Sequence, residues 1–340
     1  MILVWLMKNS NIIQQLTYQS AEDFLNDLSY GRKLFSLKNS SYVFRGQSHS
    51  HYELLPSALR SDISDLNRYL TNLTQDAPTE QLQILNEASI LYDFFKSCDY
   101  NGLFLPQVER FRNIIFSFFD FKTILQDEMW LPEDLFEIAA LAQHYGLPTR
   151  LLDWTYDINT AIYFALSEFL QKSENQSDED YLVIWGLDTK ISTKSLFFEA
   201  MKNEGEKSIV TIDEFLIRLT SKRFPLRIIR PQYYGNPNLS AQKGVFTLWE
   251  VKKNKATDGN DRQVDKRPLD VLLLDFFSSN EKITTLLTRP ILYKILLPNR
   301  EINKLYHFLK SNHIDASTLF PGYAGVIQSI KEDINMKDYS

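Results

Sequence analysis

Two short stretches of this sequence concentrate polar side chains beside residues that fix the backbone. The first is Phe44-Arg45-Gly46-Gln47, and the second runs from Ala142 to Thr155. Arginine, histidine, aspartate and glutamine side chains supply many hydrogen-bond donors and acceptors, while glycine and proline shape the loops that present them. This combination is typical of a binding or catalytic site rather than of a hydrophobic core.

Arg45 is the member of this set best suited to bind an anion. Its planar guanidinium can make a bidentate contact with a phosphate or carboxylate group. Gly46 beside it permits a close approach of the backbone. The alternative for Arg45 is a structural ion pair with an acid such as Asp153. Asp153 itself either activates an acceptor group as a base or pairs with Arg150 to fix the local loop.

His144 precedes a glycine and a proline, so it is expected in the last turn of a helix. There it acts as an acid or base, hydrogen-bonds to a hydroxyl group of a ligand, or satisfies the terminal carbonyls of the helix. Tyr145 either stacks on a flat ring of a ligand or packs in the core. Trp154 and Tyr163 are expected mainly as packing residues.

Metal and cysteine chemistry have little support in the sequence. His49 and His51 form a His-x-His pair, but no third ligand is evident, so a polar turn is expected and no metal. The single cysteine, Cys98, cannot form an internal disulfide or a cysteine-based zinc site. The phosphate-binding P-loop, the dinucleotide-binding glycine motif, the zinc-protease motif and the serine-hydrolase motif are all missing from the sequence.

The composition indicates an ordinary globular protein. The 340 residues are 44% hydrophobic and 24% charged, with a formal net charge of −6. A broad electrostatic grip on a nucleic-acid backbone is therefore not expected, although a local basic pocket is compatible with this charge. The apolar stretch Met1–Met7 is too short to cross a bilayer and lacks the layout of a signal peptide. We expect no membrane association and a cytoplasmic location.

Hydrophobic periodicity predicts a mixture of helices and strands. A capping pattern at Ser20 and Asp23 predicts a helix through Glu22–Leu28. A helix from Pro132 through Leu135–Ala142 is expected to end at Gly146 in the left-handed conformation, and a turn at Asp153-Trp154-Thr155 leads to a helix over Ala161–Leu170. Further segments predict strands at Tyr42–Phe44, Tyr181–Trp185, Gly244–Trp249 and Ile291–Leu297, and a helix at Glu301–Leu309.

This order of elements indicates a mixed α+β fold. We expect one domain over residues 20–330, with a helical insertion at 75–135 between the first strand and the rest of the sheet. The charged segment 252–268 is expected to be a flexible loop. If Tyr42 and Phe44 point into the core, Arg45 projects from the other face at the end of its strand, which is a plausible edge of a cleft.

The ordered set of motifs resembles the FRG domain, a family named for its Phe-Arg-Gly motif. The resemblance rests on Phe44–Gln47, on Tyr52–Arg60 and on Ala142–Thr155. It is extended by Ala241–Thr247 and by Leu319–Gly322, so that it covers about residues 20–330 in matching order. FRG proteins occur in many bacteria and phages, and some are associated with defence or toxin systems.

The family has been linked to the ADP-ribosyltransferase superfamily, in which a split β-sheet binds NAD in a cleft. In that superfamily an early strand supplies Arg or His, a later one Ser or Tyr, and a third strand Glu or a substitute. Arg45 matches the first position. Gln242 stands where a Glu is usual, and its amide can position a ribose hydroxyl but carries no negative charge. Its alternative role is a hydrogen bond at a strand edge. Glu250 lies on the same predicted strand, too far along it to serve the same site.

The resemblance implies an NAD-dependent ADP-ribosyltransferase-like enzyme, as a bacterial or phage toxin or defence effector. A non-catalytic module that binds a nucleotide or protein, and a hydrolase of NAD or another nucleotide, are the alternatives. NAD would be a substrate, the acceptor an unidentified protein or nucleic acid, and no metal is implied. The expected catalytic residues are Arg45, His144, Asp153 and Gln242, and the expected substrate-binding residues are Gly46, Gln47, Tyr145, Thr149, Arg150, Trp154 and Tyr163.

Overall fold

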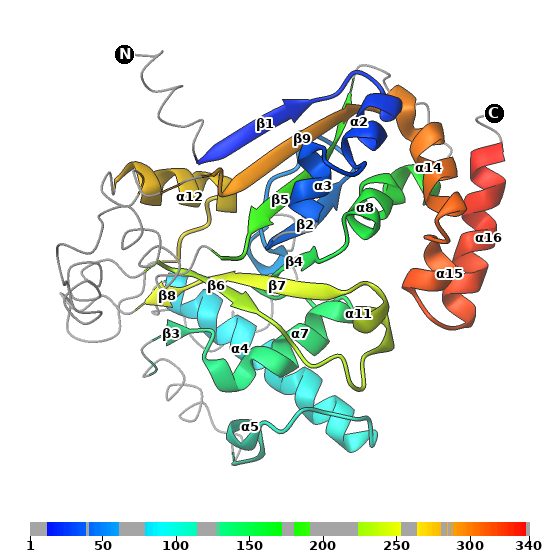
Figure 1. The fold of residues 1–340 in the computed structure, drawn as a ribbon. Coiled ribbons are helices and arrows are strands. Elements are labelled where there is room, and N and C mark those ends of the chain that lie inside the picture. The colour runs from blue at the N-terminus through cyan, green and yellow to red at the C-terminus, as the bar shows by residue number, and fades with distance from the viewer. Residues whose placement is uncertain are drawn as a thin grey trace.

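The fold is built on a mixed β-sheet that is covered by helices on both faces (Figure 1). A computed structural model describes residues 12–38, 41–60, 79–113, 127, 129–171, 180–190, 224–252, 264–279, 284, 287 and 289–337. The expected α+β class is confirmed, and the sheet is open rather than closed into a barrel.

The main sheet has seven strands in the spatial order β1-β9-β5-β2-β4-β7-β6. Only β1 and β9 run parallel, and the other neighbouring pairs are antiparallel. A small second sheet pairs β3 with β8. The strands are β1 (Ile13–Thr17), β2 (Tyr42–Gln47), β3 (Met129–Trp130), β4 (Leu152–Thr155), β5 (Tyr181–Asp188), β6 (Leu226–Ile229), β7 (Gly244–Trp249), β8 (Val251–Lys252) and β9 (Leu292–Pro298).

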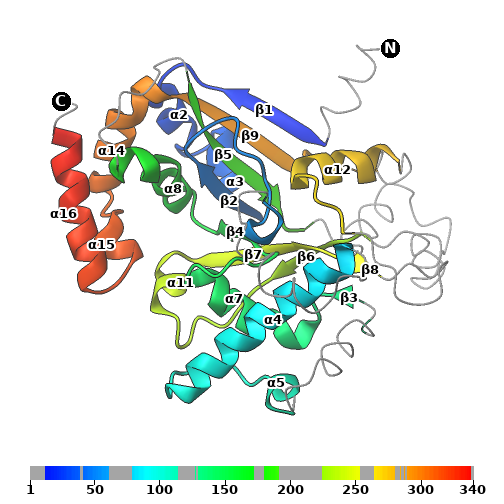
Figure 2. The same ribbon diagram turned by 180° about the vertical axis from the view of Figure 1, so that it is seen from behind.

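The sheet divides between its two central strands. Strand β2 pairs with β5 along all six of its residues, and β4 pairs with β7 along all four. Between β2 and β4, both fully described, the register comprises one pair, Phe44 with Thr155. The sheet therefore consists of two half-sheets, β1-β9-β5-β2 and β4-β7-β6, which are joined at one residue pair and separate beyond it. In Figures 1 and 2 the strands of the upper half run in a different direction from those of the lower half.

Helices occupy both faces of the sheet and the region between β2 and β4 in the chain. The α-helices are α2 (Ala21–Asp27), α3 (Lys33–Lys38), α4 (Thr79–Tyr100), α5 (Glu109–Asn113), α7 (Phe136–His144), α8 (Ile158–Gln171), α11 (Pro237–Ala241), α12 (Leu269–Ser278), α14 (Ile302–Ser311), α15 (Ala316–Leu319) and α16 (Tyr323–Lys337). The 3-10 turns within the described residues are η1 (Ser57–Leu59), η3 (Glu133–Leu135) and η4 (Asn299–Glu301).

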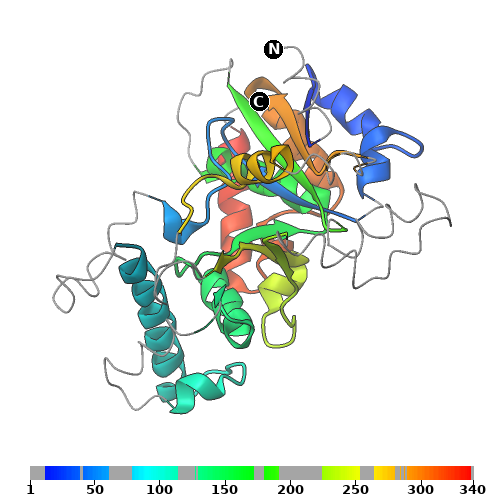
Figure 3. The ribbon, with the colours of Figure 1, turned by 90° about the vertical axis from the view of Figure 1, so that its left-hand side faces the viewer.

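Three hydrophobic clusters hold these layers together. One packs α2, α8, α14 and α15 against the half-sheet that contains β2, β5 and β9. A second packs α4 and α7 against β6 and β7 of the other half. A third lies on the opposite face, where α12 covers strands of both halves (Figure 3). On one face, each half-sheet is covered by its own layer of helices. A cleft can therefore form between the two layers, where the half-sheets separate.

Most of the elements expected from the sequence are confirmed. Ser20 caps α2 by accepting a hydrogen bond from the Asp23 amide. Helix α7 follows the turn after Pro132 and ends before Gly146, whose φ of 90° is left-handed. The predicted strands correspond to β2, β5, β7 and β9, and the predicted helices at Ala161–Leu170 and Glu301–Leu309 correspond to α8 and α14.

One strand was not predicted and one predicted turn is wrong. Strand β1 was not predicted, because it is a partly exposed edge strand whose polar sequence gives a weak periodic signal. Residues Asp153-Trp154-Thr155 form the central strand β4 rather than a turn. A four-residue strand is too short to show its alternation in the sequence, and it is its pairing with β7 that defines it.

Several expectations lie outside the described residues. These are most of the flexible loop at 252–268 and part of the helical insertion at 75–135. The described part of the insertion contains α4, α5 and β3.

Candidate functional site

A cavity of about 840 Å³ opens where β2 and β4 separate. Its lining comes from β2, β4, α7, α8, the α11–β7 connection and the segment that follows β2. All four residues expected to be catalytic, Arg45, His144, Asp153 and Gln242, line it. They are up to 197 positions apart in the sequence and are brought together only by the sheet. Gly46, Gln47 and Trp154, which were expected to bind substrate, line it as well.

Arg45 and Asp153 span the opening between the half-sheets. The Arg45 Nη1 atom donates to the backbone carbonyl of Asp153 at 2.9 Å and to its carboxylate at 2.5 Å. The guanidinium thus supplies a hydrogen bond to β4 at the level where backbone pairing has stopped. The Arg45 side chain is 13% exposed, whereas that of Asp153 is 52% exposed. The carboxylate therefore faces the open cavity while the arginine lies behind it.

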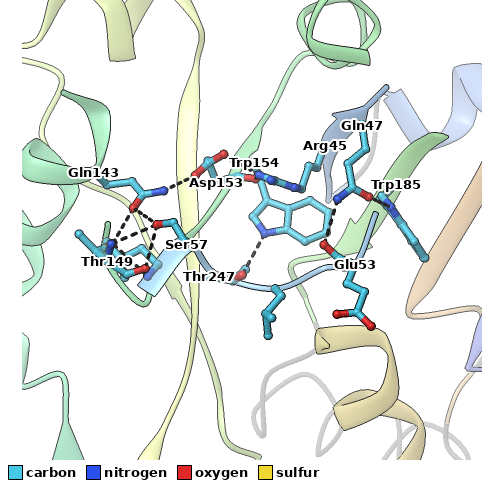
Figure 4. A network of polar contacts seen from close by, with 12 residues as sticks. Arg45, Gln47, Glu53, Ser57, Gln143, Thr149, Asp153, Trp154, Trp185 and Thr247 are labelled. Atoms are coloured by element: carbon cyan, nitrogen blue, oxygen red, sulfur yellow. Dashed lines mark hydrogen bonds and ion pairs between the residues drawn. The ribbon is translucent and has the colours of Figure 1, made fainter. Parts of the chain in front are cut away.

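Gln143 fixes the second oxygen of the Asp153 carboxylate (Figure 4). Its Nε2 donates to Asp153 Oδ1 at 2.6 Å, and its Oε1 accepts from the Thr149 hydroxyl at 2.7 Å. The Ser57 hydroxyl bonds to the backbone carbonyl of Thr149 at 3.3 Å and accepts from the Thr149 amide at 3.2 Å. Because the Thr149 hydroxyl engages the amide oxygen, the NH₂ group of Gln143 is left to point at Asp153.

These contacts determine the charge state of Asp153. Burial raises the pKa of its carboxyl group, but the nearby charge of Arg45 and the hydrogen bonds from Gln143 and Arg45 lower it more, and the charge of Arg60 lowers it further. The pKa therefore lies below the ordinary value of 3.8. Asp153 is an ionised carboxylate at neutral pH, able to stabilise positive charge in the cavity.

His144 is the last residue of α7, as expected, and its ring packs edge-on to that of Tyr145. Burial lowers the pKa of the imidazole, and the charge of Asp153 raises it by a smaller amount, so the pKa lies below 6.5. The Nε2 atom is buried and has no hydrogen-bond partner among the described residues. His144 is therefore neutral at neutral pH and has a ring nitrogen available for a proton or a hydrogen bond.

Gln242 was expected on a strand, but it is the C-cap residue of α11, just before β7. Its Nε2 donates to the carbonyl of Leu319 at 3.1 Å, and its backbone carbonyl accepts from the Thr155 hydroxyl at 2.7 Å. Its side chain thus ties the cavity wall to the end of α15. Glu250 is remote from this wall and is buried against Arg227 after the far end of β7.

Four residues expected to bind substrate are not part of the cavity lining. Tyr145 is 62% exposed on the surface. Thr149 is buried and supports Gln143 from behind. Tyr163 is buried and donates a hydrogen bond to Glu332 at 2.6 Å. Arg150 is buried too, and its expected pairing with Asp153 is wrong.

Arg150 instead forms a bidentate ion pair with Glu87 of α4, with both nitrogen–oxygen distances at 2.7 Å. The sequence could not indicate this pairing because Glu87 is 63 positions away, whereas Asp153 is close in the chain. Asp153, on strand β4, instead pairs with Arg45 of β2.

Several residues of the cavity lining were not predicted as site residues, above all Gln143, Arg60 and Glu168. Gln143 lies inside the Ala142–Thr155 run and Arg60 at the end of the Tyr52–Arg60 motif, so their place in these motifs was the available signal. Glu168 lies in the middle of an apolar helix pattern, where a single acid gives no signal.

The described residues contain no group of three or more His, Cys, Asp or Glu side chains that could hold a metal ion. His49 and His51 stack on each other, with ring centroids 5.2 Å apart. No helix in the described part of the chain is both long and apolar enough to span a bilayer.

A family model described as the FRG domain matches residues 40–174. Residues 40–174 are therefore similar to the FRG domain. The FRG match runs from β2 to α8 and includes Arg45, Arg60, His144 and Asp153, whereas Gln242 lies beyond it. Neither curated proteins nor solved structures give a match to the chain.

Proposed function

We propose that the FRG-domain cavity binds NAD or a related nucleotide and that the protein is an ADP-ribosyltransferase-like enzyme. The observation that carries this proposal is the convergence of Arg45, His144, Asp153 and Gln242 on one cavity at the division of the sheet. A cavity of about 840 Å³ is within the usual range for small-molecule sites. A cleft at a split sheet is also what the resemblance to the transferase superfamily implies.

Asp153 offers the negative charge that Gln242 lacks. When the bond between nicotinamide and ribose breaks, nicotinamide leaves with the bonding electron pair and positive charge develops on the ribose. An ionised carboxylate that is already oriented stabilises that charge without reorganisation. Asp153 is held in this state by Arg45 and Gln143. Asp153 therefore takes the electrostatic role in the proposal.

His144 and Gln242 complete the proposed reaction. The attacking hydroxyl, amine or water forms a bond to the ribose carbon and loses a proton. A neutral imidazole with a depressed pKa is a suitable acceptor for that proton. Gln242 contributes to the wall beside the ribose. The acceptor would be a protein or nucleic acid, as expected of a toxin or defence effector.

The test is incubation of the purified protein with NAD that carries a label in its adenylate part, with and without cell lysate or nucleic acid. Label on a macromolecule supports transfer. Free ADP-ribose indicates hydrolysis, and binding without nicotinamide release indicates a non-catalytic module; either of these results overturns the transferase proposal. Absence of NAD binding would overturn the proposed cavity ligand as well.

The variant Asp153→Asn should lower the rate of nicotinamide release by about 100-fold, as expected when a preorganised electrostatic group is removed. Asp99→Asn is the matched control, because Asp99 of α4 forms an exposed ion pair with Arg112 of α5 and lies outside the cavity lining. Equal rates for the two variants would contradict the role of Asp153.

A further inference from the structure

Arg60 presents to the cavity a cationic group that has no ion-pair partner among the described residues. It follows η1 as its C-cap residue, lines the cavity and is exposed. Its Nε donates to the carbonyl of Leu55 at 3.2 Å, which anchors the side chain at its inner end. Among the described residues, its two terminal nitrogens have no hydrogen-bond or ion-pair partner. The Nε atom of the guanidinium is therefore bonded to the protein, while Nη1 and Nη2 have no partner among the described residues.

Arg45 differs from Arg60 in how much of its guanidinium is available. Its Nη1 is engaged by both the carbonyl and the carboxylate of Asp153. Its Nε is buried without a partner among the described residues, and the side chain is 13% exposed. Asp153 neutralises Arg45, so an incoming anion would have to compete with this carboxylate. Of the two arginines, Arg60 is the more exposed and the one without an acid partner among the described residues, so its charge is the more available to a ligand.

Arg60 is also rigidly placed. The turn that carries it is held by the Ala58 amide, which donates to the Thr149 carbonyl at 3.0 Å, and by Gln83, which donates to the Ala58 carbonyl at 2.9 Å. Thr149 is bonded to Gln143, which in turn holds Asp153. One connected network thus positions both the free cation and the ionised carboxylate.

The other charged groups in the cavity determine where an anion can bind. Besides Asp153, the lining includes two further carboxylates, Glu53 and Glu168. Glu168 accepts a hydrogen bond from Tyr52 at 3.0 Å and lies 3.6 Å from His49. The carboxylate of Glu53 points away from Asp153 in Figure 4. These carboxylates repel a phosphate group, so a phosphate is not expected to bind throughout the cavity.

We infer that Arg60 is the group that binds a phosphate of a nucleotide in this cavity, with Arg45 acting as the partner that holds Asp153. The inference rests on the proposed nucleotide binding and deepens it, because it assigns the phosphate contact to a specific side chain. A guanidinium with two free nitrogens matches the oxygens of a phosphate group, and such charge-assisted bonds are strong.

The experiment measures the affinities of adenosine, AMP and ADP-ribose for the full chain by calorimetry. The unmodified protein should bind AMP and ADP-ribose more tightly than adenosine. Arg60→Gln should weaken the two phosphate-bearing ligands by about 10- to 100-fold and leave adenosine unchanged. Arg60→Lys should retain part of the preference, because it keeps the positive charge but loses the bidentate geometry of the guanidinium.

Inorganic pyrophosphate tests whether phosphate is bound without a nucleoside. Binding of pyrophosphate as tight as that of ADP-ribose would overturn the nucleotide assignment.

A double variant separates local contact from net charge. Arg60→Gln together with Glu168→Gln restores the formal charge of the cavity without restoring a donor at Arg60. The phosphate preference should stay lost in the double variant. Its recovery, or an equal weakening of adenosine by Arg60→Gln, would overturn the inference. An unchanged thermal unfolding temperature shows that the single variant is folded.

The outcome is distinguishable from failure of the proposed function. If NAD is not cleaved but Arg60→Gln selectively weakens AMP, the enzyme proposal fails and the phosphate contact stands. If NAD is cleaved and Arg60→Gln changes no affinity, the enzyme proposal stands and the phosphate contact is overturned. If neither AMP nor ADP-ribose binds the unmodified protein, both are overturned.

Discussion

His144 combines two properties that rarely occur together on a surface histidine. Its pKa is depressed by burial, and its Nε2 is enclosed without a hydrogen-bond partner among the described residues. An unpartnered buried nitrogen costs free energy unless something in the functional cycle engages it. The nearby carboxylate of Asp153 partly offsets the depression of the pKa. At neutral pH the imidazole is therefore neutral.

We predict that an NMR titration of His144 gives a pKa below 6.5, and that Asp153→Asn lowers it further. The second effect follows because the charge of Asp153 raises the pKa, and the variant removes that charge. The folded protein then binds fewer protons at His144 than the unfolded chain does, so stability falls as the pH drops from 6.5 through the depressed pKa. A titration midpoint at or above 6.5 would contradict the prediction.

Gly46 is required by packing as much as by the cavity that it lines. A Cβ atom at this position would lie 1.9 Å from the carbonyl oxygen of Ala161 and 2.5 Å from the amide nitrogen of Ala165, both in α8. These are backbone atoms and cannot rotate away. We predict that Gly46→Ala lowers the free energy of unfolding by at least about 3 kcal/mol in chemical denaturation, because α8 must move off β2.

Gly186 on the neighbouring strand β5 provides the control. A Cβ there would meet the Phe44 ring at 3.4 Å and Tyr293 Cβ at 3.7 Å, which are ordinary van der Waals contacts. Gly186→Ala should therefore cost clearly less than Gly46→Ala. Equal losses of stability would show that helix packing is not the reason for the glycine at position 46.

Among the elements, α4 has the most specific attachment to the core. Glu87 accepts hydrogen bonds from Arg150 at both of its oxygens, from Trp130 at 2.7 Å and from Gln83 at 2.9 Å. The ion pair is nearly inaccessible, with side chains 3% and 4% exposed. Through Arg150 the pair reaches the residues directly before β4. Helix α4 thereby holds the segment that leads into the strand carrying Asp153.

We predict that Glu87→Gln destabilises the protein by about 3–5 kcal/mol in chemical denaturation, because the variant leaves the Arg150 cation buried without a counter-charge. Asp99→Asn on the same helix should cost less than about 1 kcal/mol, since its partner Arg112 is exposed and well solvated. A loss for Glu87→Gln as small as that for Asp99→Asn would mean that Arg150 finds another partner.

At the scale of the whole molecule, the segment that matches the FRG domain is shorter than the part of the chain that forms the main sheet. Residues 40–174 contain β2 and β4 but not the strands that flank them in the sheet. Strand β2 pairs along its full length with β5, and β4 pairs along its full length with β7, both from beyond residue 174. Within the matched segment the two strands share one residue pair. The cavity exists only because later strands hold the earlier ones.

We therefore predict that the isolated segment 40–174 does not fold cooperatively, whereas the full chain does. Without β5 and β7, both central strands would expose their backbone groups and much of their buried side chains. Thermal unfolding followed by circular dichroism tests this. A sigmoidal transition for the isolated segment, with the heat of unfolding expected for its length, would contradict the prediction.

What the sequence determined by itself is the local part of the protein. Caps such as Ser20, the left-handed stop at Gly146 and the apolar periodicity of α8 act through neighbours within a few residues, so they could be predicted. The motif residues Arg45, His144, Asp153 and Gln242 could be selected because their chemistry and their neighbours stand out in the sequence. The α+β class followed from the order of the periodic segments.

Only the tertiary structure decided which residues meet and which way each one faces. Asp153 meets Arg45 and Arg150 meets Glu87 because the pairing of β4 with β2 and β7 fixes the positions of both residues, Asp153 within the strand and Arg150 just before it. The pairing of β4 with β7 joins residues 89 to 95 positions apart, and no local pattern encodes such a contact. The division of the sheet beside that strand then sets Arg60 and Asp153 in one cavity.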